Sequence, residues 1–233
     1  MPQNKLAQAL ADSLARVKAV AQDGIINSSD ISRTDRERLQ RAGWLQPIIK
    51  GWYLIGLDLD QAQGSSTLWY SHIWCFIRHY LSSRYQQDYC LSAEISLDLH
   101  TQASTIPKQI IAITKASGTN SLKLPHNTSL LSYSDPSNLP EQTEQVNGLQ
   151  LMPLELALCR VAPRYFETAP LNSELALRLA NPDQLSRILM QGAHTRAANR
   201  LMGAFQFIQE PDKAQRIKDD MWAIGYRTSP VNP

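Results

Sequence analysis

DGIINSSDISRTDRERLQRAGWLQPIIKGWYLIG, residues 23–56, is the stretch that decides how this chain is organised. It predicts a short helix over Arg33 to Ala42, which Gly43 ends by taking the left-handed conformation that glycine accepts. In a capping box, a hydroxyl group and an acid three residues later satisfy the first backbone N–H groups of a helix. Two such boxes overlap here: Ser32 with Asp35, and Thr34 with Glu37.

The predicted helix carries basic side chains along one side. At 100° per residue, Thr34, Arg38 and Arg41 fall within about 60° of one another, and Glu37 lies at their edge. Leu39 falls on the opposite side, where it can pack against the isoleucines of the preceding turn. The sequence therefore predicts one exposed basic stripe above a small apolar face.

Two β-rich runs follow this helix, Trp44–Ile48 and Trp52–Ile55, joined across Ile49-Lys50-Gly51. Gly51 can take the positive φ that a tight hairpin requires. In front of the stretch, apolar residues recur every three or four positions over residues 4–22 and predict a helix that closes the core beneath. The order helix, turn, basic helix, hairpin indicates a winged helix-turn-helix.

This pattern has two interpretations. Any amphipathic helix can carry arginines on its solvated side. The order of the elements and Lys50 at the hairpin tip favour binding to double-stranded operator DNA, as a monomer or as a dimer on an inverted repeat. We expect three side chains to contact bases and three to contact phosphates. They are Thr34, Arg38 and Arg41 for the bases, and Arg33, Arg36 and Lys50 for the phosphates.

The charge distribution agrees with a local DNA-binding surface. The net charge of the 233 residues is only +2, which argues against a general affinity for polyanions. The first 56 residues hold 8 basic and 5 acidic side chains, whereas the remainder holds 15 and 16. Positive charge is therefore concentrated where phosphate contacts would use it.

The cysteines and the N-terminal residues indicate the compartment. The 3 cysteines show no C-x-x-C spacing, and an odd count is typical of reduced thiols. The start, MPQNKLAQAL, lacks the apolar region of a signal peptide, and no run approaches the roughly 18 apolar residues of a membrane span. We therefore expect a cytoplasmic protein that does not enter a membrane.

A linker is expected after the hairpin. DLDQAQGSS, residues 58–66, has no apolar period and is expected to join a winged helix-turn-helix domain over residues 1–57 to a second domain over residues 67–233. The second domain begins with Thr67–Leu81, which is apolar around most of its circumference and is typical of a buried central helix.

The rest of the second domain is expected to be a small antiparallel sheet followed by helices. Short strands such as Lys108–Thr114 are expected to lie against the aromatic helix. Ser134–Asn147 is polar and is expected to be a surface connection. From Pro153 onward, prolines separate a series of predicted helices. The fold class expected for the whole chain is α+β.

Two other clusters have both a structural and a functional interpretation. His72, Cys75 and His79 share one helix face and could hold zinc in an enzyme, but a single helix face is a poor tetrahedral cage. Core packing is favoured, so no metal and no cofactor are expected. A second basic cluster could be a solvated face, a second DNA contact or a docking site for an acidic toxin, and the solvated face is favoured. Its members are Arg187, His194, Arg196 and Arg200.

No motif for catalysis is found. G-x-x-x-x-G-K-[ST], G-x-S-x-G, H-E-x-x-H and G-x-G-x-x-G are all absent from the sequence. A nucleotidyltransferase would carry Gly-Ser followed by Asp-x-Asp, whereas Asp58-Leu59-Asp60 precedes Gly64-Ser65 here. The residues therefore predict a protein that is not an enzyme.

The organising stretch resembles the N-terminal winged domain of the AbiEi family. The matching residues are Asp23-Gly24-Ile25-Ile26, Ser32 to Arg41, Gly43 and Gly51-Trp52-Tyr53-Leu54. The turn before the basic helix is shorter than is common in that family. The family consists of antitoxins of type IV toxin–antitoxin systems that also repress their own promoters. The resemblance implies an antitoxin that counteracts a co-encoded, nucleotidyltransferase-like toxin.

A weaker similarity to the same family extends over Tyr89–Thr114 and Leu151–Val161. Asp212–Pro233 is similar to the segment that joins such a region to a Fic domain in longer bacterial proteins. An alternative function is therefore a non-catalytic interaction and regulatory module associated with a Fic-type enzyme. The histidine loop of Fic enzymes is absent from this chain.

Overall fold

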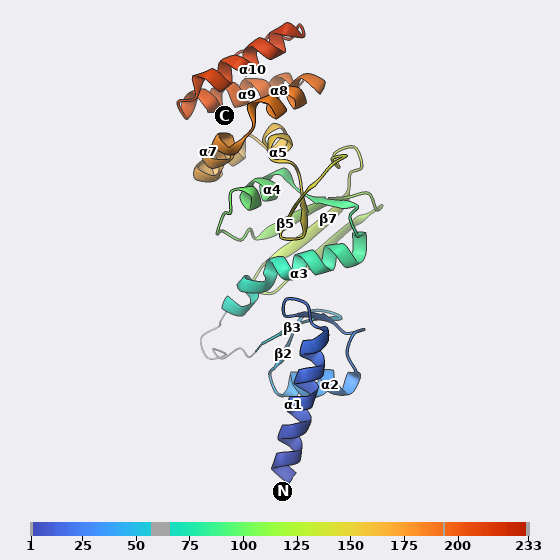
Figure 1. Ribbon diagram of the computed structural model, residues 1–233. Helices are drawn as coiled ribbons and strands as arrows, with labels where there is room; N and C mark the ends of the chain where they lie inside the picture. Colours follow the sequence, from blue (N-terminus) through green and yellow to red (C-terminus); the bar gives the residue numbers. More distant parts are fainter. Residues whose placement is uncertain (1, 57–65, 193, 232–233) are drawn as a thin grey trace. The chain divides into compact units, whose positions relative to one another are not determined.

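The structure, a computed structural model, describes residues 2–56, 66–192 and 194–231, with side chains from residue 5 onward. It combines helices with small sheets, so the expected α+β class is confirmed (Figure 1). The chain packs as two compact units. The first contains Met1–Gln87, Pro107–Ile110 and Thr119–Leu131, and the second contains the rest. The predicted division into domains at residues 57–67 stays a prediction, and the linker falls almost wholly outside the described residues.

The first unit begins with a helix, a strand, a second helix and a hairpin. In order they are α1 (Pro2–Val20), β1 (Ile25–Asn27), α2 (Arg33–Arg41), β2 (Leu45–Ile49) and β3 (Trp52–Ile55). The strands form an antiparallel sheet in the order β1-β3-β2. The predicted positions of both helices and both hairpin strands are confirmed.

Local backbone chemistry explains these boundaries. Ser32 is the N-cap of α2, and its Oγ accepts a hydrogen bond from the Asp35 backbone N–H at 3.1 Å. Gly43 follows the end of α2 with a φ of +75°, and Gly51 turns the hairpin with a φ of +85°. L-residues rarely adopt such values, so glycine is suited to both positions.

α1, α2 and the small sheet share one core. Val17 of α1, Ile26 of β1, Leu39 of α2 and Leu45 of β2 are all at most 3% exposed and pack together. Figure 1 shows α2 lying across α1 in this unit. Three elements, α1, β1 and β2, thus pack against the apolar side of α2.

A long aromatic helix, α3 (Thr67–Tyr85), packs behind the hairpin within the first unit. Trp52 of β3 meets Phe76 and Tyr80 of α3 edge-on, with ring centroids 5.9 Å and 6.2 Å apart. The indole N–H of Trp69 donates to the Thr128 hydroxyl at 3.1 Å. The prediction of a buried, central aromatic helix is therefore confirmed for this face of α3.

Two more sheets are present. A four-stranded sheet has the order β4-β5-β7-β6, built from β4 (Tyr89–Leu91), β5 (Gln109–Thr114), β6 (Thr119–Lys123) and β7 (Ser129–Ser134). β5 and β7 each have some residues in the first unit and the others in the second. Within the second unit, α4 (Ala93–His100) begins at the N-cap Ser92 directly after β4.

The third sheet is a hairpin within the second unit, and the sequence did not predict its first strand. β8 (Glu144–Val146) pairs with β9 (Leu149–Leu151) around Asn147-Gly148. Both turn residues have positive φ, +50° and +77°, which is the signature of a two-residue hairpin turn. The prediction that residues 134–147 form only a surface connection is therefore wrong at its end, where Asn-Gly was the overlooked signal.

Helices form the remainder of the second unit. They are α5 (Leu154–Arg160), α6 (Arg164–Thr168), α7 (Pro170–Leu179), α8 (Pro182–Gln191), α9 (Thr195–Phe207) and α10 (Pro211–Ala223). Proline stands in the first turn of α7, α8 and α10, where its missing N–H has no cost. The predicted helices are confirmed, and α6 is an additional short one.

The end of the described chain lies against α9. The backbone N–H of Val231 donates to the Asn199 carbonyl at 3.0 Å, and the N–H of Ser229 donates to the Asn199 side chain at 3.0 Å. A Cβ at Gly203 would lie only 2.0 Å from the Val231 carbonyl oxygen. Close approach of this tail therefore requires glycine at position 203. None of the helices in the described ranges has the length and apolar character to span a lipid bilayer.

We predict that Gly203→Ala displaces the tail and lowers the free energy of unfolding by about 1–3 kcal/mol, because a methyl group has no room beneath the Val231 carbonyl. Thermal unfolding and limited proteolysis would measure both effects. Gln206→Ala, at an exposed position of the same helix, is the control. A Gly203→Ala protein with unchanged stability and an equally protected tail would contradict the close approach.

Candidate nucleic-acid interface

The start of α2 is held by the N-cap Ser32. Its hydroxyl accepts from the Asp35 N–H and donates to Asp35 Oδ2 at 2.8 Å, so the predicted pairing of Ser32 with Asp35 is confirmed for the N-cap hydrogen bond. The second predicted box, Thr34 with Glu37, is wrong. Thr34 already lies inside the first helical turn, and the Glu37 carboxylate contacts arginine side chains instead.

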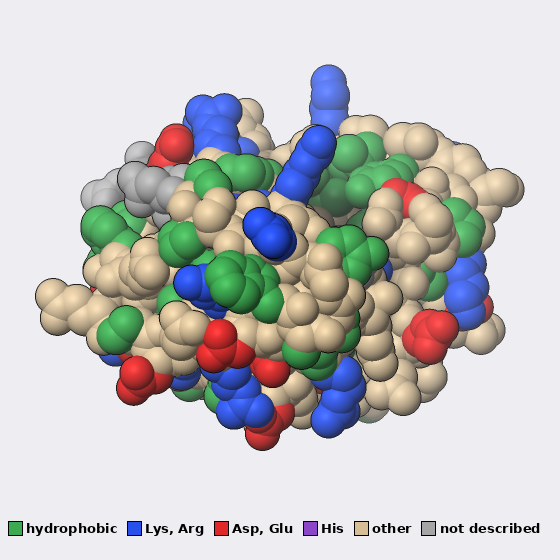
Figure 2. All heavy atoms as spheres, turned by 90° about the horizontal axis from the view of Figure 1, so that it is seen from above, with side chains coloured by type: hydrophobic (Ala, Val, Ile, Leu, Met, Phe, Trp, Pro, Cys, Tyr) green, Lys and Arg blue, Asp and Glu red, His purple; other side chains and the backbone are tan. Residues whose placement is uncertain are grey.

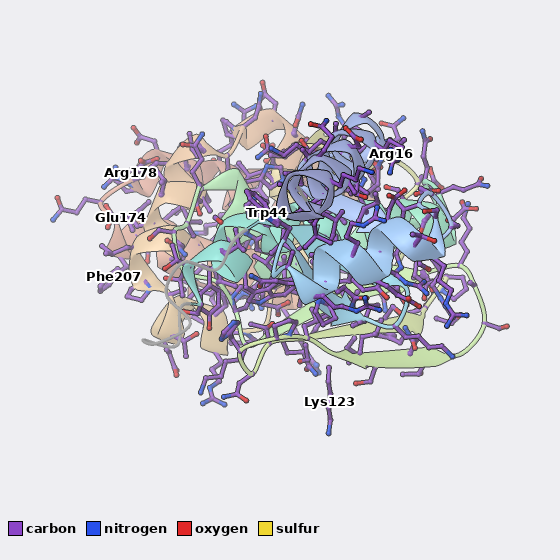
Figure 3. The ribbon with its side chains drawn as sticks, turned by 90° about the horizontal axis from the view of Figure 1, so that it is seen from below. Arg16, Trp44, Lys123, Glu174, Arg178 and Phe207 are labelled. Carbon is purple, nitrogen blue, oxygen red and sulfur yellow. The ribbon has the colours of Figure 1, made fainter. Side chains whose placement is uncertain are left out.

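Asp35 ties α2 to α1. Its side chain is buried, and Arg16 of α1 contacts both carboxylate oxygens, with Nη2–Oδ1 and Nε–Oδ2 distances of 2.6 Å and 3.2 Å (Figure 3 labels Arg16). The hydrogen bond from Arg16 holds the pKa of Asp35 far below its usual value, with further help from Ser13 and Ser32 and against the opposing effect of burial. The sequence reveals Asp35 only as a capping residue. Its contact with Arg16, 19 positions earlier, requires the packed structure.

Arg38 belongs to the same anchor. Its Nη1 donates to Ser13 Oγ at 2.6 Å and to the Ala9 carbonyl oxygen at 3.3 Å, both on α1. Only 33% of the Arg38 side chain is exposed. The prediction that Arg38 shares an exposed stripe with Thr34 and Arg41 is therefore wrong, because α1 covers the side of α2 from which Arg38 projects.

The outward side of α2 carries two arginine side chains with the carboxylate of Glu37 between them. Arg33 and Arg41 have 84% and 82% of their side chains exposed, and Thr34 is exposed between them in sequence. Glu37 lies between the two guanidinium groups, 2.7 Å from Arg33 Nε and 3.7 Å from Arg41 Nη2. The hydrogen bond from Arg33 lowers the pKa of Glu37, so this carboxylate stays charged at neutral pH.

An open cavity of about 690 Å³ lies on the surface between α2 and the tip of the hairpin. Arg36 and Lys50, both predicted to contact phosphate, line it from opposite elements. The other lining residues are Asn27, Ser28, Glu37, Gln40, Gly51 and Tyr53. Gln40 was missed in the sequence, although it follows Arg36 by four positions and therefore shares its helix face.

The hairpin tip is held by a backbone hydrogen bond to the segment that follows β1. The Gly51 carbonyl accepts a hydrogen bond from the Ser28 backbone N–H at 2.8 Å, and a Cβ at Gly51 would lie 3.4 Å from Ser28 Oγ. Lys50 at this tip is exposed. Five of the six predicted DNA-contacting residues thus lie on the outer side of α2 or on the tip, and Arg38 does not.

The second predicted basic cluster also contains exposed residues and one residue that packs against neighbouring helices. Arg187, His194 and Arg196 are exposed on or just before α8 and α9. Viewed onto the C-terminal helices, basic, acidic and apolar side chains lie among one another (Figure 2). This face therefore has no large field of one sign.

Arg200 is half-buried beneath α5 and α6 and is wrongly included in that cluster. Its Nη2 donates to the carbonyl oxygens of Leu158 and Cys159, each at 3.2 Å, and its guanidinium lies 5.6 Å from the centroid of the Phe166 ring. Burial lowers its pKa. Arg200 thus caps the C-terminal end of α5, where positive charge complements the helix dipole.

Both histidines of the three side chains weighed as a zinc site have a local contact. His72 Nδ1 lies 2.8 Å from the Leu68 carbonyl oxygen, and His79 Nε2 lies 3.1 Å from Asp23 Oδ2. Burial raises the pKa of the Cys75 thiol. Among the described residues, no three His, Cys, Asp or Glu side chains are grouped to hold a metal ion. Asp58, Asp60, Gly64 and Ser65 lie outside the described residues.

We predict that Asp35→Asn lowers the free energy of unfolding at neutral pH by about 1–3 kcal/mol, since a charged acceptor of several hydrogen bonds is lost. The folded pKa of Asp35 is below the unfolded value of 3.8, so its stabilisation is complete above that value and fades as the pH falls through the folded pKa. The difference from wild type should therefore shrink below pH 3.8. Urea unfolding followed by tryptophan fluorescence across acidic pH measures it.

Asp30→Asn, at an exposed position in the same unit, is the control for the loss of one negative charge. A constant difference between Asp35→Asn and wild type at every pH would contradict a charged, hydrogen-bonded Asp35.

Comparison with known proteins relates the chain to solved structures by fold. No family model and no curated protein matches the sequence. The crystal structure of the RV2827C protein from Mycobacterium tuberculosis is similar, with a TM-score of 0.56 and 16% sequence identity. The match covers 95% of this chain and 84% of that chain. At this identity the likeness is one of fold.

Proposed function

We propose that the first unit is a winged helix-turn-helix that binds operator DNA, with α2 as the recognition helix and the β2–β3 hairpin as the wing. The observation that carries this proposal is the pairing of two outward arginines on α2, Arg33 and Arg41, with an open cavity between Arg36 and Lys50. A groove-reading helix beside a cationic cleft matches the shape and charge of duplex DNA.

The positions of these side chains suggest which would contact bases and which would contact phosphates. With its side chains α2 is about 10–12 Å across, a diameter that fits into a major groove about 12 Å wide. Arg33, Thr34 and Arg41 would face base edges from its outward side. Arg36 and Lys50 would receive a phosphate in the cavity. Arg38 would act as a positioning residue, because its hydrogen bonds to α1 set the rotation of α2.

Glu37 opposes this function. Its carboxylate neutralises part of the charge of Arg33 and Arg41 and would lie close to the phosphates of bound DNA. An acid at this position weakens non-specific binding more than it weakens binding to a site whose bases attract both arginines. Glu37 would therefore favour discrimination over affinity.

We further propose that the chain is a non-catalytic antitoxin of a type IV system that represses its own promoter. This step is supported by the AbiEi-like residues of the organising stretch and by the similarity of Tyr89–Thr114 and Leu151–Val161 to the same family. Co-expression with the toxin encoded beside it, followed by growth and promoter activity, tests both roles. Growth arrest that the chain does not relieve would refute the antitoxin role alone.

We predict that Arg41→Ala weakens binding to the chain's own upstream DNA by about 1–3 kcal/mol while leaving random duplex almost unaffected, because a base contact is lost. Lys50→Ala should weaken both DNAs alike and lower the salt slope by roughly 0.9, because one phosphate contact is lost. Fluorescence anisotropy over a salt series measures both quantities.

Arg38→Ala is the matched comparison on the same helix. It should lower stability without a selective loss of preference for the operator, because Arg38 bonds to α1. Equal affinity of the wild-type chain for operator and random duplex would refute the proposed repressor.

We predict that Glu37→Gln tightens binding to random duplex by roughly two- to five-fold, the range expected for exposed charge interactions, and tightens operator binding less. The amide removes the repulsion between Glu37 and phosphate and frees two guanidinium groups. The same titrations measure it, with Asp30→Asn as an exposed control of equal charge change. Unchanged or weaker binding of random duplex by Glu37→Gln would contradict the proposed docking face.

A further inference from the structure

The outer side of α7 is apolar. Leu171, Leu175 and Leu179 recur every four residues and are 81%, 42% and 55% exposed. The opposite side of α7 is buried through Ser173, Ala176 and Leu177. We call the three exposed leucines the leucine stripe. A helix with apolar residues on both sides is usually covered on both sides, so the stripe marks an interaction surface.

A second apolar feature adjoins the stripe. Phe207, at the end of α9, is 79% exposed and lines a cavity of about 330 Å³ between α6, α7 and α9. Phe166, Leu171 and Leu177 line the same cavity. The stripe, Phe207 and the cavity therefore form one continuous apolar surface of the second unit.

The charges beside the stripe are paired within the chain, and Lys213 lies 2.7 Å from Glu210. Arg178 donates to Glu174 Oε1 through Nη2 and Nε at 2.8 Å and 3.0 Å, and through Nη1 to Glu210 at 2.9 Å. Figure 3 shows Glu174, Arg178 and Phe207 projecting on the same side of the second unit. A surface with both signs side by side does not select a strongly acidic or basic partner, but it can complement itself.

An antiparallel pair of α7 helices satisfies both the apolar and the charged groups. With Leu175 on the two-fold axis, Leu171 lies opposite Leu179 of the partner subunit, because the two positions are equally distant from 175. In the same register, Glu174 comes beside Arg178 of the partner subunit. The three leucines thus meet leucines and each Glu174 comes near an arginine, so the same patch serves on both subunits, as an isologous contact requires.

We propose that the occupant of this surface is a second copy of the chain, bound through an antiparallel α7–α7 contact centred on Leu175. The 10 residues of α7 span only about 15 Å, whereas stable dimers bury about 800 Å² on each partner. Phe207 and the cavity must therefore be part of the interface. The association needs no DNA, so it goes beyond the proposed function and holds independently of it.

Sedimentation velocity of the full chain, from low to high micromolar concentration, tests the proposal without DNA. The wild type should shift from monomer toward dimer. Leu175→Glu should remain a monomer, because it places two like charges on the two-fold axis. Leu6→Glu, which changes a leucine 73% exposed on α1, should dimerise as the wild type does. A wild type that stays monomeric throughout, or a dimer that Leu175→Glu leaves intact, would overturn the proposal.

Cross-linking tests the register with proteins that keep their fold. In a Cys75→Ser background, Leu175→Cys should form a disulfide-linked dimer under mild oxidation, because facing Cβ atoms at the axis approach within disulfide distance. Leu171→Cys alone should not, since its two copies would lie about 12 Å apart along the axis. Mixing Leu171→Cys with Leu179→Cys should restore the cross-link. Efficient cross-linking of Leu171→Cys to itself would overturn the antiparallel arrangement.

Discussion

The contact between Asp35 and Arg16 is the constraint on which the proposed DNA-binding surface depends. A helix of 9 residues is too short to be stable by itself, so its position must come from its neighbours. Leu39 supplies the apolar contact, but an apolar contact does not fix rotation about the helix axis. The buried carboxylate does, because it accepts from α1 and from the N-cap of α2 together. Arg33, Thr34 and Arg41 point outward because Asp35 points inward.

Much of the fold could be predicted because its signals are local. Ser32, Gly43 and Gly51 act on the backbone within a few residues of themselves, so the boundaries of α2 and the hairpin followed directly. The prolines that separate α7, α8 and α10 act in the same way. β8 was missed for the opposite reason. Its polar sequence, Glu-Gln-Val, has no apolar pattern, and only the following Asn147-Gly148 turn indicates that it pairs.

The candidate site was predicted less completely. Helical periodicity gives the angular position of a side chain around the helix axis, but it does not say which other element packs against that side. The angular position of Arg38 is intermediate between the exposed and the buried sides of α2, and the path of α1 decides which side it joins. Arg200 shows the same limit at longer range. Its sequence neighbours suggest a basic patch, yet its hydrogen-bond partners are about forty residues earlier in the chain, a separation that spacing rules do not reach.

Arg200 in the second unit and the outward arginines of α2 in the first unit also differ in how strongly salt screens their charges. The charge of Arg200 is half-buried beside two carbonyl groups and the Phe166 ring, so salt screens it less than it screens an exposed charge. Arg33 and Arg41 of α2 are exposed to solvent, so their interactions depend on ionic strength. Moderate salt would therefore weaken attraction to a polyanion while leaving the helical scaffold almost untouched. If the proposed DNA binding holds, salt would release the DNA before it destabilised the helices of the second unit.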